Sequence, residues 1–192
     1  LSGEIAQRMG IQYVFGLYAI LMLLCVLVAA RLPAPRLEAA APYWTSLRRF
    51  MADRRWWGFL AGVLLFGMAM ATINNYYVLH LQALGASEGL YGLSVAAASV
   101  SEIPIFFLSA LLLRAWQPRG LIRLAFVALA VRCLLYTLLV NPAWAVAIQL
   151  LHGLSFSAMW AAGVSYAGQL APPGVGASAQ AVFGATLYGL AG

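Results

Sequence analysis

The run GLYGLSVAAASVSEIPIFFLSALLL, residues 89–113, decides the fold class of this chain. It carries a single charged side chain, Glu102, in a stretch long enough to cross a bilayer, because one helical crossing needs about 20 mostly apolar residues. Similar runs recur along the 192 residues, of which 64% are hydrophobic and 8% are charged. Helices satisfy their own backbone hydrogen bonds in lipid. The sequence therefore predicts an all-α, polytopic membrane helix bundle.

The apolar runs predict five complete spans and a sixth that begins near Ser178 and is still apolar at Gly192. The chain opens on LSGEIAQRMG, without an initiator Met or a basic leader. Together with the unfinished last helix, this opening indicates a fragment of a longer protein. The complete spans are predicted at residues 11–30, 57–84, 89–113, 121–140 and 143–170.

Arginine sets the expected orientation, because the chain contains no lysine. The positive-inside bias places the two arginine-rich links in the cytoplasm. We expect a multi-pass protein of the cytoplasmic (inner) membrane. The net charge of +6 then reports orientation and indicates no nucleic-acid partner. The arginines of the first link are Arg31, Arg36, Arg48, Arg49, Arg54 and Arg55, and those of the second are Arg114, Arg119 and Arg123.

The second half of the first link, YWTSLRRFMADRRWW at residues 43–57, has two interpretations. Helical spacing places Trp44, Leu47, Phe50 and Met51 on one face, which favours an amphipathic helix on the inner membrane surface. A solvated basic linker is the alternative. In either case the segment separates the first span from the closely connected spans that follow.

Three ionisable residues lie within consecutive spans: Glu102, Arg132 and His152. A charge at the bilayer centre costs a few kcal/mol, so such residues usually face the bundle interior and pair with each other. At 1.5 Å per residue, Arg132 lies about 12 Å and His152 about 14 Å from the same side of the membrane. Glu102 lies somewhat deeper, within reach of a long arginine side chain. We expect a common interior site for proton coupling, with Glu102 paired to Arg132; a static ion pair that pins three helices is the alternative.

Polar and small side chains follow one face of several spans at helical spacing. We interpret these faces as the lining of a wet cavity for a hydroxylated or aromatic solute, with interhelical hydrogen bonding in a dry bundle as the alternative. On the second span, His80 shares the polar face, whereas Asn74 and Tyr77 are expected to point elsewhere. The expected cavity-lining residues are Thr72, Asn75, Tyr76, Ser101, Ser155 and Met159.

These residues and motifs resemble the C-terminal half of a major facilitator superfamily transporter, with the end of the N-terminal half attached. Within the superfamily, the chain is most similar to the group of lactose permease and the phenylpropionate and nucleoside proton symporters. The resemblance implies helices six to eleven of twelve: residues 1–31 end the N-terminal bundle, 32–55 form a basic cytoplasmic linker, and 56–192 form the C-terminal bundle with an incomplete last helix. It rests on the series LGAS, YGL, SEIPIFF, VRCLLY, NP, QLLHGLSFSAMWAA, YAGQLAPP and AQAVFGA, over most of residues 60–190.

The resemblance also implies functional residues. Lactose permease is similar in having a glutamate on helix eight, an arginine on helix nine and a histidine on helix ten, which match Glu102, Arg132 and His152. Its second carboxylate, one turn after the histidine, is Ser155 here, so the coupled proton would be carried by Glu102 or by an acid in the N-terminal half. The family's cytoplasmic gating loop matches the segment of Arg114, Arg119 and Arg123.

Alternating access follows from the resemblance, and with it secondary active transport of a small organic solute by proton symport. The implied partners are a sugar, nucleoside or aromatic acid, protons and the lipid bilayer, and the expected state is a monomer. No enzyme, cofactor or metal is expected: the spans show no nucleophile with a base, and Cys25 and Cys133 lie singly in apolar runs. A membrane sensor or scaffold that keeps the fold without transporting is the alternative function.

Overall fold

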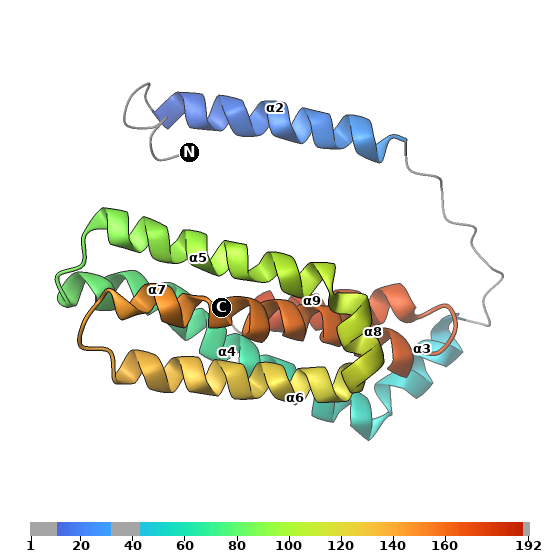
Figure 1. Ribbon diagram of the computed structural model, residues 1–192. Helices are drawn as coiled ribbons and strands as arrows, with labels where there is room; N and C mark the ends of the chain where they lie inside the picture. The colour runs from blue at the N-terminus through green and yellow to red at the C-terminus, as the bar shows by residue number, and fades with distance from the viewer. Residues whose placement is uncertain (1–10, 32–42, 190–192) are drawn as a thin grey trace. The chain divides into compact units, whose positions relative to one another are not determined.

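The computed structural model describes residues 11–31 and 43–189, and the chain divides into two compact units, Leu1–Ala39 and Ala40–Gly192 (Figure 1). Every regular element in these described ranges is a helix, which confirms the all-α prediction. The first unit contributes α2 (Ile11–Ala29), a helix of 19 residues without a charged side chain, at the position of the first predicted span. The predicted continuation of the last helix to Gly192 and the linker residues 32–42 lie outside the described residues.

The second unit forms a helical bundle. Four of its helical stretches, residues 54–83, 88–107, 109–137 and 144–170, are long and apolar enough to cross a membrane. They correspond to the second to fifth predicted spans. The elements of this unit are α3 (Tyr43–Met51), α4 (Arg54–Ala83), α5 (Glu88–Phe107), α6 (Ser109–Thr137), α7 (Trp144–Gln149), the π-helix η1 (Gly153–Ser157), α8 (Ala158–Leu170) and α9 (Gly176–Tyr188).

Short polar caps start the first two long helices of this unit. The backbone N–H of Arg55 donates to Asp53 Oδ1 at 2.8 Å at the start of α4, and the N–H of Leu90 donates to Ser87 Oγ at 3.3 Å at the start of α5. Between them, Gly85 has φ +75°, a conformation that glycine adopts without a steric penalty. The motif LGAS is therefore a tight corner between two spans.

The boundary between the third and fourth spans differs from the prediction. Helix α5 ends at Phe107, before the predicted end of the third span at residue 113, and the chain re-enters a helix at Ser109. The break expected in the arginine-rich turn is a kink inside α6 at Gln117, which has φ 55°. Pro118 follows, and a proline disfavours helical geometry in the residue before it. Most of the expected loop is thus helical.

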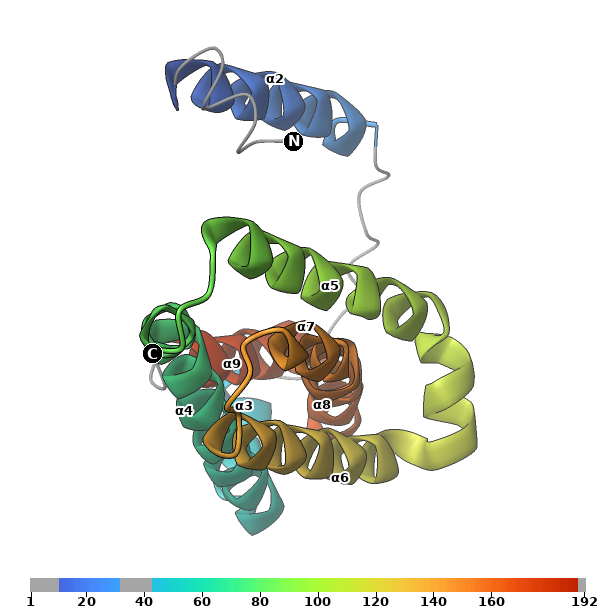
Figure 2. The ribbon, with the colours of Figure 1, turned by 60° about the vertical axis from the view of Figure 1, so that its left-hand side comes forward.

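The last complete span lies at the centre of the second unit. Helix α5 packs on α7 and η1, and α6 packs on η1 and α8, so these two helices lie on opposite sides of the central span (Figure 2). Helix α9 packs against α4 and α8. The largest side chains of the core include Trp56, Phe59, Phe66 and Phe183, and the rings of Phe59 and Phe183 stack with centroids 5.7 Å apart. Helices α4 and α9 therefore pack together through aromatic side chains.

The segment before α4 is a helix. Phe50 of α3 is 4% exposed and its ring lies 4.5 Å from that of Trp56, whereas Trp44 is 78% exposed. Arg48 and Arg49 are also exposed. This agrees with the amphipathic-helix interpretation for residues 43–51, where Phe50 packs into the core, whereas residues 54–57 of the predicted helix begin α4. The position of α3 at the membrane surface stays a prediction.

Candidate functional site

A hydrogen bond between two ionisable side chains joins α5 to the central span. Glu102 Oε1 lies 3.1 Å from His152 Nε2, and the two side chains are 26% and 16% exposed. The His152 ring stacks on Phe156 with centroids 5.3 Å apart. Its Nδ1 is buried and has no hydrogen-bond partner among the described residues. The Glu102–His152 contact can therefore hold one proton between the two helices.

The register of this pair is set by the residues next to it. Glu102 follows Ser101, and His152 precedes Gly153, the first residue of η1. The backbone N–H of Gly153 donates to Ser101 Oγ at 2.9 Å, and a Cβ atom on Gly153 would overlap the Ser101 carbonyl oxygen. Only glycine permits this approach. Single-turn π-helices inside α-helices frequently occur at functional sites.

We expect Gly153→Ala to destabilise the protein by about 3 kcal/mol, because overpacking against fixed backbone forces the two helices apart. The measurement is thermal or chemical unfolding of the full-length protein in detergent. Gly92→Ala on α5 is the matched control: its Cβ would meet nothing within 4 Å, so the change is neutral or stabilises by up to about 1 kcal/mol. Equal stability of the Gly153 and Gly92 variants would contradict the close contact.

Arg132 does not pair with Glu102 as expected. Its side chain is 1% exposed, Nη1 donates to Ser155 Oγ at 2.8 Å, and Nη2 donates to Gln149 Oε1 at 3.0 Å. Within the described residues, Arg132 forms no ion pair, and the Glu102 carboxylate contacts His152 instead. The Ser101–Gly153 contact brings the Glu102 carboxylate beside the His152 imidazole. The Arg132 guanidinium donates instead to two neutral acceptors of the central span. The expected Glu102–Arg132 pair is thus replaced by two separate interactions.

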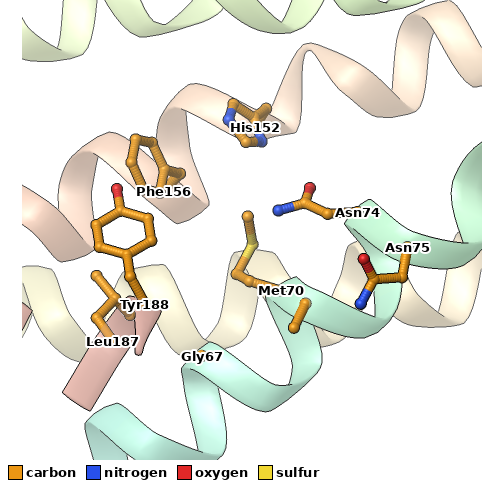
Figure 3. Close-up of a pocket in the computed structure, with 9 residues that line it drawn as sticks. Gly67, Met70, Asn74, Asn75, His152, Phe156, Leu187 and Tyr188 are labelled. Atoms are coloured by element: carbon orange, nitrogen blue, oxygen red, sulfur yellow. The ribbon is translucent and has the colours of Figure 1, made fainter. Parts of the chain in front are cut away.

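Two cavities meet at His152. A cavity of about 240 Å³ is lined by Glu102, Arg132 and His152 together, with Asn74 and Tyr77 among its other walls. A second, of about 480 Å³, shares Asn74 and His152 with the first. In Figure 3 the Asn74 amide points toward the His152 ring. The three ionisable residues of the sequence analysis therefore face one space. Other residues lining the second cavity are Met70, Asn75, Phe156 and Tyr188.

The expected polar face of α4 is divided between two sites. Asn75 lines the 480 Å³ cavity, but Thr72 and Tyr76 line a different cavity of about 350 Å³, with His80 and Tyr136. Asn74 and Tyr77, which were expected to point elsewhere, line the cavity of Glu102. Periodicity could not decide this, since the run TINNYY places polar residues on every side of a helix.

The three other expected lining residues have different surroundings. Ser101 binds the Gly153 backbone, and Ser155 is fully buried beneath the Arg132 guanidinium. Met159 is fully buried in the hydrophobic core, beside a separate cavity that Arg119 and Arg123 also line. None of the three lines either cavity at His152. Sequence reasoning missed Gln149, although it lies three residues before His152 and so on the same helix face.

The arginines of the predicted gating loop all lie on α6 and are exposed. Arg114 lies before the kink at Gln117, whereas Arg119 and Arg123 follow it. The Arg119 guanidinium lies 5.5 Å from the ring centroid of Tyr166 on α8. The kink thus separates Arg114 from Arg119 and Arg123, which line one cavity with residues of α4 and α8.

Comparison with known families agrees with this helical architecture. A model of the MFS_1 like family matches residues 1–192. The chain belongs to this major facilitator family. Membership, together with the long apolar helices, makes it part of a multi-pass membrane protein and supports transport as its general class. No solved structure matches the chain.

Several curated major facilitator proteins are similar to the chain. It is 33% identical over 127 residues to the major facilitator superfamily domain-containing protein 6-like protein A of Xenopus laevis, covering 66% of this chain and 21% of the relative. It is 27% identical over 183 residues to the human 6-like protein, and 30% identical over 172 residues to that of Danio rerio. These matches cover 94% and 87% of this chain, and 31% and 32% of the relatives. The chain thus spans about a fifth to a third of the length of these relatives.

Proposed function

We propose that the whole protein is a secondary active transporter that moves a small organic solute by alternating access and is driven by proton symport. The observation that carries the proposal is the Glu102–His152 hydrogen bond on a cavity inside the membrane-spanning bundle. In this proposal, residues 1–31 end the N-terminal bundle, residues 32–55 are the cytoplasmic linker, and residues 56–192 belong to the C-terminal bundle.

The cost of charge in lipid supports a functional site. Ionisable residues within spans are expensive and usually mark substrate or proton pathways. A bundle that needs only packing can use glycine, alanine and hydroxyl side chains, as the Ser101–Gly153 contact already does. Glu102 and His152 keep part of their surface open to the cavity, so that water can deliver and remove a proton. A contact that only holds two helices together does not need to be reached by water.

Proton coupling in this site would act through the charge of Glu102. Protonation makes the carboxyl group neutral, while Arg132 on the same cavity keeps its fixed positive charge. The Glu102–His152 contact links α5 to the central span, so a change in that contact alters how these helices hold together. A proton drives transport only if it binds one access state more tightly than the other. Glu102 is therefore the proposed proton carrier, and His152 its partner.

The solute site is proposed in the cavity of about 480 Å³, a size typical of small-molecule sites. Asn74 and Asn75 offer amide donors and acceptors, and Phe156 and Tyr188 offer aromatic surfaces. This combination suits a sugar, a nucleoside or an aromatic acid. The protein would act as a monomer in the cytoplasmic membrane, with Arg114, Arg119 and Arg123 at its cytoplasmic gate.

Uptake by energised vesicles that contain the full-length protein tests this proposal. Labelled sugars, nucleosides and aromatic acids are offered one class at a time, with and without a protonophore. We expect one class to accumulate above its external concentration, and the protonophore to abolish the accumulation. If every class fails to enter while the protein is folded and binds a solute, the sensor or scaffold alternative replaces the transporter.

A further inference from the structure

A basic cavity of about 370 Å³ lies between α4, α6 and α8, away from the two cavities at His152. Arg55 of α4 and Arg119 and Arg123 of α6 line it, and all three side chains are exposed. Within the described chain, no residue that lines it is acidic, and no carboxylate forms an ion pair with these arginines. Asp53 instead accepts from the backbone of Arg55. Among the residues that the structure describes, the cavity therefore presents three positive charges without a carboxylate partner.

The same cavity becomes apolar along α4. Arg55, Gly58 and Gly62 line it at helical spacing, over about 10 Å at 1.5 Å per residue. A Cβ atom on Gly58 would meet nothing within 4 Å, and one on Gly62 would lie 3.5 Å from the Phe126 ring. The two glycines form a strip that is open at Gly58 and lies against the Phe126 ring at Gly62, beside the buried core residues Phe59 and Val63.

Helix α6 forms the facing wall with the same order of side chains. Arg119 and Arg123 lie at the basic end, and Ile122 and Phe126 continue toward the middle of the helix. The Arg119 guanidinium is held over Tyr166, with 5.5 Å from its central carbon to the ring centroid. Both walls thus run from charge to apolar surface in the same direction.

We propose that this cavity binds an anionic phospholipid of the cytoplasmic leaflet. Its phosphate would contact Arg55, Arg119 and Arg123, and an acyl chain would follow the strip of Gly58 and Gly62. The positive-inside bias places the arginine-rich end on the cytoplasmic side, where anionic lipids attract basic groups between helices. Guanidinium groups bind phosphate with paired, charge-assisted hydrogen bonds. A free anion would leave the apolar strip unfilled, which favours a lipid. This proposal is independent of the transport proposal.

Lipid titration of the purified full-length protein tests the site, with bound lipid counted by native mass spectrometry. We expect the affinity for dioleoyl phosphatidylglycerol to be at least about ten times that for dioleoyl phosphatidylcholine. Arg119→Gln combined with Arg123→Gln lowers the phosphatidylglycerol affinity about 25-fold, since each basic residue at an anionic lipid surface contributes about fivefold. Arg48→Gln combined with Arg49→Gln removes the same charge from α3, outside the cavity, and keeps the wild-type affinity.

Gly58→Leu provides a second test that leaves all three arginines in place. A Cβ atom on Gly58 meets nothing within 4 Å, so we expect the variant to unfold at the wild-type temperature. The leucine side chain then fills the strip, and we expect the phosphatidylglycerol affinity to fall. Unchanged affinity in this variant overturns the proposal. An equal loss of phosphatidylglycerol affinity in the α3 variant also overturns the proposal, because it would indicate unspecific attraction between arginine and anionic lipid. Displacement of phosphatidylglycerol by millimolar inorganic phosphate would assign the cavity to free anions and also overturn it.

Discussion

Replacing Glu102 with glutamine in the full-length protein abolishes uphill accumulation of solute and leaves part of the downhill exchange. Glutamine has nearly the same shape and its amide oxygen still accepts from His152 Nε2, across the 3.1 Å that separates the two side chains. It cannot take up or release a proton, so protons no longer bind one access state more tightly than the other. The accumulation ratio in energised vesicles therefore falls to about one, because without coupling no free energy is supplied. Counterflow of labelled solute in de-energised vesicles measures the exchange that remains.

The matched control is Glu88→Gln, which changes the other carboxylate of α5. Glu88 lies in the first turn of the helix, is exposed, and lines none of the described cavities at His152. This variant should accumulate solute as the wild type does. If Glu102→Gln accumulates solute equally well, Glu102 is a structural residue and the coupling proposal is wrong.

The second large effect is expected at Arg132. Arg132→Ala removes one of the largest fully buried side chains and leaves Gln149 and Ser155 without their donor. Truncation of a large core side chain costs about 2–5 kcal/mol, and unsatisfied buried polar groups add to that cost. We therefore expect a loss of about 3 kcal/mol or more in the free energy of unfolding, together with loss of transport. Chemical unfolding of the full-length protein in detergent measures it.

Arg132→Met separates the roles of volume and charge. Methionine fills much of the same space without a buried charge, and apolar replacement of buried charged groups is often nearly neutral for stability. This variant should recover most of the stability that Arg132→Ala loses, but no transport if the positive charge on the cavity is needed. An alanine variant as stable as the wild type would show that the guanidinium network contributes nothing to the fold.

Span positions could be predicted because they depend on local properties of the chain. A run such as residues 57–84 forms a helix in lipid when it is long enough and apolar enough to cross the bilayer. The observed α4 (Arg54–Ala83) begins three residues earlier and ends one residue earlier. The same local properties predicted that Glu102, Arg132 and His152 lie within spans. The kink at Gln117 falls within the turn predicted between the third and fourth spans, whereas the end of α5 at Phe107 was not predicted, because residues 89–113 form one continuous apolar run.

The partners of these residues were decided by tertiary structure. Helix rotation brings Asn74 and Tyr77 to the cavity and turns Thr72 and Tyr76 away from it. Gly153 lies against the Ser101 backbone, and this contact between residues far apart in the sequence pairs Glu102 with His152 and leaves Arg132 to Ser155 and Gln149. The sequence by itself determined the class of fold, the spans and the three ionisable residues, since burial in lipid acts on each segment separately. Which side chains meet depended on the rotation and register of packed helices, because those are set only when the helices touch.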